Sequence, residues 1–496
     1  MSLTSFMRKQ ILSTVIVIVI PALFFGCSSG SSTSTSNMPN TNVPPYDGNT
    51  YPIQIDQAAA TETGTVFYVD PNTGNMSSDG SISAPWSTLQ AVIENNKIET
   101  MRTASQPYQE GVGFVIKNPG APVKAGDTII LKSGHHGDVL INSYFNTEYI
   151  NVIAEDGATV SRLHVQAGSK WRFKGLTVRP DAGYSEKYSL VFLESHNWSG
   201  PVYNITIDEF NIYSVETAST AWSTTNPANW DELSCSGIIA DGNNMTIRKN
   251  YLKNVDFGIT VSGNYGLVSG NTIENFAGDG MRGLGNDLFF EYNVVKNCYA
   301  VNTNHDDGFQ SWSINDDPPR ERVVLRGNTI INYTDPNQPF RGTLQGIGCF
   351  DGWYINWVVE NNVIITDHWH GISLYGAISS RIVNNTVIDQ NDASPGPPWI
   401  GFFDHKNGTP SVNCLIRNNI APSYIIGTGA TADHNYEIPD YASYAGLFVD
   451  HQNFNVRLRP GSTLIDAGSA DKAPLLDITG VARPGGAGVD LGAYEN

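Results

Sequence analysis

The sequence predicts an all-β fold made of stacked coils, because one short pattern recurs through the middle of this 496-residue chain. In each repeat a glycine precedes an apolar residue, and an asparagine follows later with strand-forming residues after it. The asparagines of the pattern are Asn250, Asn271, Asn293, Asn328, Asn362, Asn385 and Asn419. They recur about every 22 residues, with about a dozen residues inserted in some repeats, and such a period is typical of solenoids. The segments between them are short and alternating, so each coil consists of strands.

We interpret the repeat as a right-handed parallel β-helix, in which each coil bonds only to its neighbours and the apolar positions stack into one core. The repeated asparagine suits a turn inside this stack. Side-chain amides at equivalent positions can hydrogen-bond to one another, so that no buried amide is left unpaired. The same register reaches back to Phe173 and Leu176. The β-helix, as the catalytic domain, is therefore expected over residues 126–425.

The N-terminus has the pattern of a targeting segment. Arg8 and Lys9 precede an apolar run that is too short to span a membrane, so residues 1–26 are predicted to be a signal peptide. The run ends at Gly26-Cys27, which resembles a bacterial lipobox. That resemblance implies lipidation of Cys27 and an outer-membrane lipoprotein held only by its lipid, with a secreted protein as the alternative. Residues 27–55, rich in Ser, Thr, Asn and Pro, are expected to be a flexible, lipid-anchored linker.

Residues 56–125 and 426–496 are predicted to close the two ends of the solenoid. In the first segment, Ser87 followed by Gln90 has the pattern of a capping box before a helix. A capping helix there would cover the open N-terminal edge of the stack. The stretch that contains it resembles the entry segment of bacterial β-helix carbohydrate enzymes. The C-terminal segment resembles the last module of secreted bacterial β-helix proteins, including polysaccharide lyases.

Composition excludes some partners. The net charge is −19 and only 16% of the residues are charged. No basic stripe is present that would neutralise phosphates, so nucleic acid is not expected as a partner. An anionic sugar polymer needs only local positive charge or a bridging cation, and the protein is expected to act on it as a monomer. Four cysteines follow Cys27 without a CxxC pair, which disfavours zinc and leaves their disulfide state open: Cys235, Cys298, Cys349 and Cys414.

Polar side chains collect on one stripe of the repeat. The residue before the repeated glycine reads Asp279, Asp307, Gln345 and His370 in different coils, and Asp306 lies beside Asp307. The outward positions that follow, and the residues just before the turn, add a second set: Arg282, Gln310, Trp312, Tyr375, His405, His305 and His368. Stacked strands are about 4.8 Å apart, so the carboxylates, Arg282 and Gln310 should crowd within about 5–7 Å. His370 and Tyr375 should lie about 10 Å from Asp307.

One chemistry that fits is β-elimination of a uronate polymer. In its terminal modules and its stripe, the chain resembles β-helix lyases of the pectate lyase and chondroitinase B/alginate lyase type. That resemblance implies Ca²⁺ bound by Asp279, Asp306 and Asp307, or neutralisation of the substrate carboxylate by Arg282. His370 and Tyr375 would act as base and acid. The expected catalytic set also holds Gln310 and the two adjacent aspartates. Substrate binding is assigned to His305, Trp312, His368 and His405.

The alternative chemistry is hydrolysis with inversion. Asp279-Gly280, Asp306-Asp307 and His370-Gly371 resemble the pattern of polygalacturonase-type glycoside hydrolases. The resemblance implies that Asp307 or Asp306 is the general acid, with the other carboxylates activating water across a gap of ~6.5–9.5 Å. A third interpretation is a non-catalytic glycan-binding β-helix, which predicts an aromatic stripe without clustered titratable groups. We expect a lyase acting on an acidic polysaccharide, with the hydrolase as the alternative.

Overall fold

The computed structural model describes the chain except residues 1–37, 45, 182–183, 217–225 and 314–317. The predicted signal peptide and Cys27 lie outside the described residues. The chain divides into two units at Met38, and the second, Pro39–Asn496, is compact and holds the fold. Among the described residues, no helix has the length and apolar character needed to cross a membrane.

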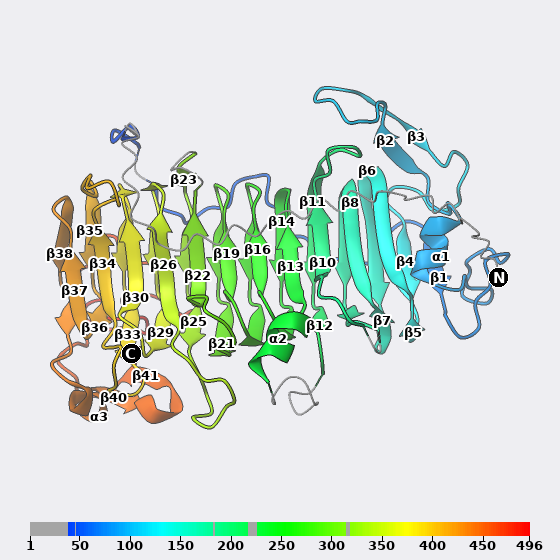
Figure 1. Cartoon of the computed structure of the whole chain (residues 1–496). Helices are drawn as coiled ribbons and strands as arrows, with labels where there is room; N and C mark the ends of the chain where they lie inside the picture. Colours follow the sequence, from blue (N-terminus) through cyan, green and yellow to red (C-terminus); the bar gives the residue numbers. More distant parts are fainter. Residues whose placement is uncertain (1–37, 45, 182–183, 217–225, 314–317) are drawn as a thin grey trace, which may run out of the picture. The chain divides into compact units, whose positions relative to one another are not determined.

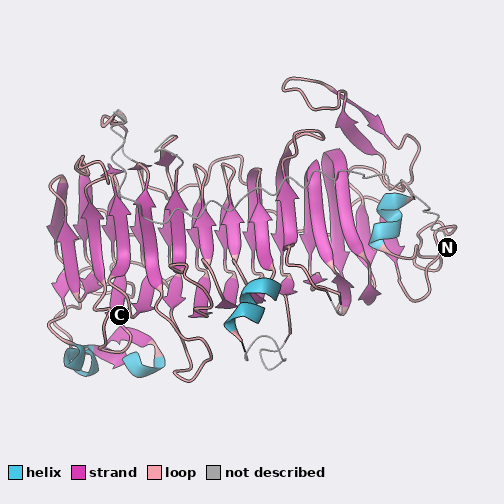
Figure 2. Ribbon diagram, in the orientation of Figure 1, coloured by secondary structure: helices cyan, strands magenta, loops and turns pink. Residues whose placement is uncertain are grey.

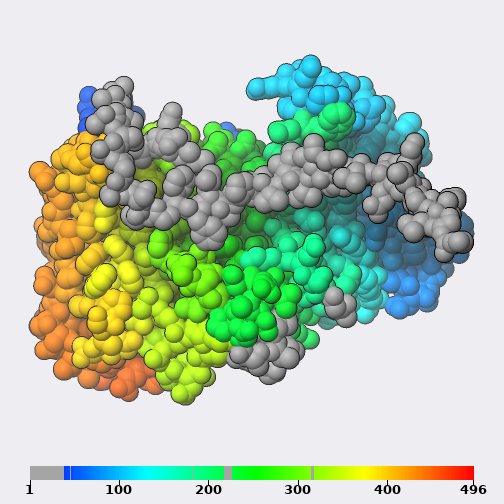
Figure 3. All heavy atoms as spheres, viewed as in Figure 1, coloured from blue at the N-terminus to red at the C-terminus, as the bar shows by residue number. Residues whose placement is uncertain are grey.

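The second unit is a parallel β-helix, as the sequence predicted. Each repeating coil contributes one strand to each of three faces, and each strand pairs in parallel with the equivalent strand of the next coil. Strands are its main regular secondary structure, and short helices lie at its margins (Figure 2). The coils follow one another as bands of colour along the unit in the space-filling view (Figure 3).

The first face carries the polar stripe, and its neighbouring strands are seen side by side in Figure 1. Its strands are β10 (Ser189–Glu194), β13 (Ser236–Ala240), β16 (Ile259–Val261), β19 (Met281–Gly283), β22 (Asp307–Trp312), β26 (Gln345–Asp351), β30 (His370–Tyr375), β34 (Trp399–Phe403) and β37 (Ser423–Ile426). Two long strands, β6 (Asp138–Ala154) and β8 (Arg162–Lys174), begin the stack and bend from this face into the second.

The second and third faces complete each coil. The second consists of β1 (Val66–Val69), β4 (Thr128–Leu131), β11 (Val202–Asp208), β14 (Asn243–Arg248), β17 (Leu267–Ser269), β20 (Phe289–Glu291), β24 (Val324–Arg326), β28 (Val358–Glu360), β32 (Arg381–Val383), β35 (Cys414–Arg417) and β38 (Ala430–Asp433). The third consists of β5 (Gly134–His135), β7 (Ala158–Val160), β9 (Thr177–Val178), β12 (Asn211–Tyr213), β15 (Tyr251–Val255), β18 (Thr272–Phe276), β21 (Val294–Cys298), β25 (Thr329–Ile331), β29 (Val363–Thr366), β33 (Thr386–Asp389), β36 (Ile420–Ala421) and β39 (Tyr436–Glu437).

The remaining elements lie outside the three faces. They are the hairpin of β2 (Thr100–Thr103) and β3 (Phe114–Lys117), the corner strands β23 (Arg320–Glu321), β27 (Tyr354–Ile355) and β31 (Ala377–Ile378), the C-terminal pair β40 (Phe448–Asp450) and β41 (Asn455–Leu458), the helices α1 (Leu89–Glu94), α2 (Pro227–Leu233) and α3 (Tyr444–Leu447), and the 3₁₀ turns η2 (Tyr441–Ser443) and η3 (His451–Asn453).

Stacked apolar side chains fill the interior. On the first face Ile238, Ile259, Met281, Phe309, Ile347, Ile372 and Ile400 follow one another in register and are at most 1% exposed. The repeated glycine precedes this column because the coils approach too closely there for a side chain. A Cβ on Gly258 would lie 2.2 Å from the carbonyl oxygen of Gly280, and a Cβ on Gly346 would lie 2.3 Å from that of Gly371.

The asparagine ladder forms as the sequence predicted. Each asparagine donates its Nδ2–H to the Oδ1 of the next at 2.8–3.0 Å, from Asn250 to Asn419 and on to Asn435. The same Oδ1 accepts the backbone N–H of the asparagine before it, as between Asn271 and Asn293 at 3.0 Å. These fully buried amides therefore satisfy one another at the turn between the second and third faces.

The described part of the expected linker is packed, not free. Residues 39–44 and 46–58, named the strap here, run along the second face from its late coils back toward β11. Arg381 donates to the Tyr46 carbonyl at 2.7 Å, the Tyr51 hydroxyl bonds Glu291, and Asp56 pairs with Arg172 at 2.7 Å. The strap departs from the predicted flexible tether because its tyrosines and Ile55 cover apolar side chains of this face: Leu267, Phe289, Val324 and Val358.

The N-terminal helix lies within the predicted segment but begins one residue later. Thr88, not Ser87, is the N-cap and accepts the Ala91 N–H at 3.0 Å. Gln90 bonds Glu94 instead of the cap. The helix adds Leu89, Val92 and Ile93 to the main core. Its role as the cap of the stack stays a prediction.

The C-terminal segment lies along the side of the coils. Asn361 and Asn384 donate to the carbonyls of Leu476 and Asp490, and the Ala493 N–H bonds Thr386 Oγ1. Its apolar residues pack on the third face, against the outer side chains of β25, β29, β33 and β36. The C-terminal segment was expected to cap the last coil, but it covers several coils from the side. Ile426, in the last strand of the first face, stays 53% exposed.

Candidate functional site

The predicted stripe forms on the outer side of the first face. Parallel pairing aligns Arg282 of β19 with Gln310 of β22, Gln310 with Gly348 of β26, and Gly348 with Ser373 of β30. The side chains fall into two neighbouring groups. We name them the acidic cluster (Asp279, Arg282, Asp306, Asp307 and Gln310) and the β30 cluster (His368, His370, Ser373 and Tyr375).

The acidic cluster is held by short polar contacts. Arg282 Nε donates to Asp279 Oδ2 at 2.6 Å, and the Asp307 amide donates to Asp279 Oδ1 at 3.0 Å. Gln310 Nε2 bonds Asp307 Oδ2 at 3.0 Å. The Arg282 guanidinium lies over the Phe257 ring, 3.7 Å from its centroid, and 5.5 Å from that of Trp312. The proximity expected for these residues is therefore found, and Arg282 is fixed toward the coil before it.

Two carboxyls of this cluster are buried without full pairing. Asp306 is 5% exposed and Asp307 is 0% exposed, and one oxygen of each has no hydrogen-bond partner among the described residues. The thiol of Cys298 bonds the other Asp306 oxygen at 3.4 Å. Burial raises the pKa of Asp306 to about 8, helped by Asp279 and opposed by Arg282. Burial, with the charges of Asp279 and Asp306, raises the pKa of Asp307 well above its usual value. Asp306 thus favours the protonated form at neutral pH, and burial disfavours the anionic form of Asp307 as well.

The arrangement does not fit the predicted calcium ion. Both Asp279 oxygens are engaged, by the Asp307 amide and by Arg282. Across the described part of the chain, no three His, Cys, Asp or Glu side chains are placed so that they could hold a metal. Calcium needs six to eight oxygen ligands, and buried carboxyls with raised pKa values would supply them poorly.

The β30 cluster surrounds the imidazole of His370, which has a defined hydrogen-bond partner in Ser373. His370 Nδ1 lies 2.8 Å from Ser373 Oγ, which also accepts the Trp399 indole N–H at 2.9 Å. The His370 amide donates to His368 Nδ1 at 3.2 Å, so the proton of the neutral His368 ring is on Nε2. Burial lowers the pKa of both imidazoles to about 4. Both rings are therefore neutral at physiological pH.

Aromatic rings line the same surface. Phe350 contacts His370 and Tyr375, with ring centroids 4.8 Å and 5.5 Å apart. Tyr375 stacks on Phe403 at 4.5 Å. Burial raises the pKa of Tyr375, so its phenol keeps its proton. Partly exposed aromatic faces of this kind suit the apolar faces of sugar rings.

Gly348 and Phe350 separate the two groups. A Cβ on Gly348 would lie 2.1 Å from Asp307 Oδ1 and 2.7 Å from the Phe350 ring, so only glycine leaves room for both. The strand carrying Asp307 is two strands from that carrying His370, about 10 Å by the spacing of a sheet. Arg282 is one strand further, and it cannot meet the same sugar carbon as His370.

Two expected substrate ligands differ in their placement. His305 is exposed and close enough to His368 and His370 to lower the pKa of both. His405 is 4% exposed and stacks on Trp353 at 4.3 Å, away from the stripe. The register predicted for His405 is wrong, because Gly401 pairs with Ser373 and not with the repeated glycine Gly371, after an irregularity next to His370. Its role as a substrate ligand stays a prediction.

Sequence reasoning missed several residues of the surface. Phe350 and Ser373 occupy outward positions of the repeat, so the register alone would have pointed to them. Trp399 could not be found in this way because its strand is shifted. Trp230 of α2 is buried against Tyr299. The four cysteines Cys235, Cys298, Cys349 and Cys414 are buried and free.

Comparison with known proteins gives structural likeness only. No protein-family model matches the chain, and no curated protein matches it in sequence. Among solved structures, pectate lyase Pel9A is similar at 18% identity and TM-score 0.39, covering 88% of this chain and 97% of that one. The GH136 lacto-N-biosidase from Eubacterium ramulus is similar at 12% and 0.42, over 76% and 68%. XylC with xylose is similar at 9% and 0.43, over 87% and 99%. Likeness at these values does not assign a reaction to this chain.

Proposed function

We propose that the protein cleaves an acidic, uronate-containing polysaccharide by β-elimination at the β30 cluster. The observation that carries the proposal is a neutral imidazole and a protonated phenol on one strand, inside a partly exposed aromatic surface. Elimination needs a base for the C5 proton, an acid for the leaving oxygen and a donor to the substrate carboxylate. His370, Tyr375 and His368 would supply them in that order.

The proposed proton path uses one tautomer of His370. Ser373 Oγ has two lone pairs and can accept from both Trp399 Nε1 and His370 Nδ1. Nε2 then carries the lone pair that takes the C5 proton. The electrons of the C–H bond form the C4=C5 double bond, and the C4–O4 bond breaks. Tyr375 donates its proton to the departing oxygen.

The remaining groups would bind the polymer. His368 Nε2–H would hydrogen-bond the carboxylate of the reacting sugar and favour removal of the adjacent proton. Arg282 and Gln310, two to three strands away, would bind a sugar further along the chain. Phe350 and Phe403 would pack against sugar rings. The substrate would thus cross the strands of the first face.

Hydrolysis at the acidic cluster is the second candidate, favoured by one specific observation. Asp306, with a pKa of about 8, and Asp307, whose pKa is also raised, lie beside the salt bridge between Asp279 and Arg282. An inverting glycosidase uses one protonated carboxyl as acid and one ionised carboxyl as base, about 6.5–9.5 Å apart so that a water molecule fits between base and sugar. Against it, Asp307 is fully buried under the Phe350 ring.

The deciding experiment incubates the protein with alginate, polygalacturonate, glucuronan and chondroitin, with and without EDTA. Ultraviolet absorbance of the unsaturated uronate reports elimination, and new reducing ends without it report hydrolysis. Under the proposal, H370A and Y375F lower kcat about 10²–10⁴-fold, as expected for loss of a general base or acid, while D306N retains turnover. Loss of activity in D306N with retention in H370A would move the chemistry to the acidic cluster. Sensitivity to EDTA would restore the calcium prediction.

A further inference from the structure

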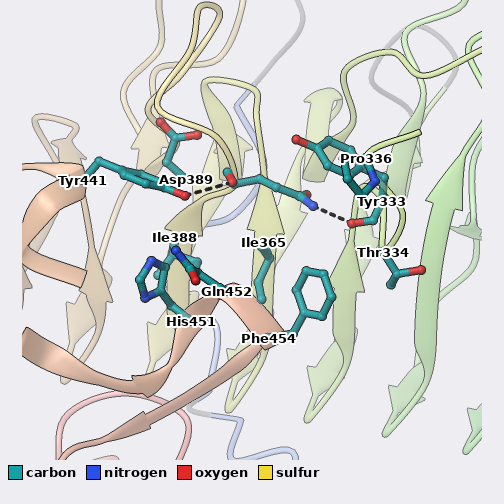
Figure 4. Close-up of a pocket in the computed structure, with 11 residues that line it drawn as sticks. Tyr333, Thr334, Pro336, Ile365, Ile388, Asp389, Tyr441, His451, Gln452 and Phe454 are labelled. Carbon is teal, nitrogen blue, oxygen red and sulfur yellow. Dashed lines mark hydrogen bonds between the residues drawn. The ribbon is translucent and has the colours of Figure 1, made fainter. Parts of the chain in front are cut away.

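A separate cavity lies between the third face and the C-terminal segment (Figure 4). Its volume is about 240 Å³. Ile365 of β29 and Ile388 of β33 form its apolar floor, and His451, Gln452 and Phe454 reach it from the η3 turn. The first face and its stripe lie on another side of each coil, so this cavity is independent of the proposed reaction.

Three aromatic side chains surround the cavity. Tyr333 follows β25, Tyr441 begins η2, and Phe454 follows η3. Figure 4 shows the Phe454 ring pointing from the C-terminal segment toward the third face. Phe454 has φ 62° and ψ 15°, the left-handed region that a bulky side chain rarely adopts. Backbone strain of this kind concentrates where a structure holds a side chain for a function.

The polar side of the cavity offers acceptors. Asp389 is 4% exposed, and burial raises its pKa to about 6. Gln390 donates its amide N–H to the Tyr333 carbonyl, while its buried Oε1 has no hydrogen-bond partner within the described residues. The Tyr441 hydroxyl bonds the Gln390 carbonyl at 3.3 Å. An acceptor left unpaired in this way needs a donor from outside the chain.

Charge around the cavity selects against anions. The negative charges of Asp367 and Asp392 act on Asp389, and both raise its pKa further. Asp367 is itself buried behind Asn332 and Asn391, which bond its two oxygens at 2.6 Å and 3.2 Å. Among the lining side chains, only His451 could carry a positive charge, and burial lowers its pKa. A carboxylate ligand would therefore be repelled.

We propose that this cavity binds one neutral pyranose unit. Its volume is below the range typical of drug-sized ligands, which suits a single ring. The rings of Tyr441 and Phe454 would pack against the C–H faces of the sugar. Asp389 would accept its hydroxyl protons. The unit could be a free sugar or a neutral residue of a glycan, and the two sources share this chemistry.

Saturation-transfer NMR and calorimetry on the full chain test the proposal. The ligands are glucose, galactose, mannose and xylose, with glucuronate and galacturonate as the charged counterparts of the first two. A neutral sugar is expected to bind at least tenfold more tightly than its uronate. Reducing-end methyl glycosides and short neutral oligosaccharides distinguish a free sugar from a glycan residue.

Variants assign the binding to the cavity. F454G is expected to fold normally, because glycine accepts the left-handed conformation, and to weaken sugar binding at least tenfold. D389N should reduce the difference in binding affinity between each neutral sugar and its uronate at neutral pH. Y251A, an exposed aromatic of the same face outside the cavity, is the control and should bind as the parent does. Absence of binding by all four neutral sugars, equal binding of uronates, or unchanged binding in F454G would overturn the proposal.

Discussion

At the scale of single residues, neighbouring groups of the first face are held in uncommon protonation states by burial. His370 is neutral because removal from water disfavours its cationic form, and Asp306 is protonated because removal from water disfavours its anionic form. The same physical cause thus prepares a base in one cluster and an acid in the other. The pH dependence of turnover should tell which one is used.

Elimination with His370 as base predicts a rate that rises with pH and levels off above about 5. The base must be unprotonated, and its pKa is lowered to about 4, so activity is lost only as the pH falls through that value. Hydrolysis with Asp306 as the general acid predicts instead that the rate falls at alkaline pH. That acid must be protonated, and activity would fall as the pH rises through about 8.

The measurement is kcat/KM from pH 3.5 to 9.5 on the best polymer, with circular dichroism at each pH as the control for folding. If kcat/KM of D306N still falls at alkaline pH, ionisation of Asp306 is not the cause of that fall. An acid limb that persists unchanged in a variant lacking the imidazole would contradict the role of His370.

At the scale of elements, the asparagine ladder links the coils through buried amides. Substituting Asn293 with alanine removes the acceptor for both the backbone N–H and the side chain of Asn271, and the donor to Asn328. Each buried polar group left unpaired costs about 1–3 kcal/mol. We expect N293A to lower the free energy of unfolding by about 2–5 kcal/mol, measured by urea denaturation.

The matched control is N304A, an exposed asparagine in a loop before β22. It should unfold at the parent's urea concentration. Hydrogen exchange should localise the effect of N293A to the coils on either side, because a solenoid coil contacts only its neighbours. If N293A and the parent have equal free energies of unfolding, the hydrogen bonds of the ladder stabilise the fold no more than hydrogen bonds to water would.

The elements were predictable where the repeat is regular. Glycine and asparagine recur because coils meet closely and amides must pair, and both requirements are visible in the sequence. The repeat failed as a guide at β34, where an irregularity beside His370 shifts the register and takes His405 out of the stripe. Proximity within the acidic cluster followed from strand spacing. The burial of Asp307 under Phe350 did not, since it depends on the rotamer of one ring over Gly348.

At the scale of the whole unit, the strap joins coils that are far apart. It covers Phe289, Val324 and Val358 and buries Ile55 to 5% exposure. Burying one large apolar side chain contributes about 1.5–3 kcal/mol, so removing the strap, taken as the loss of about two such burials, should cost about 3–6 kcal/mol. A chain lacking residues 1–58 is expected to unfold at lower urea concentration and to show faster hydrogen exchange on the second face.

The control is a chain lacking only residues 1–37, which retains the strap and should match the full chain in both measurements. Equal stability of the two shortened chains would show that the strap rests on the face without supporting it. The composition of the strap is typical of a flexible linker, because most of its residues are small or polar. Its partners are arginines and carboxylates hundreds of residues away, which no local pattern reveals.

The strap also fixes an order of events during synthesis. It leaves the ribosome before any coil, yet one of its binding partners, Arg381, is made 335 residues after Tyr46. Coils can form one upon another as they emerge, because each requires only its predecessor. The strap must wait as an undocked leader until the late coils exist, and its closure is a long-range, late step. A nascent chain that ends before Arg381 would therefore keep its strap undocked, whereas the strap of the finished protein is docked. The state of the strap thus distinguishes unfinished from finished molecules.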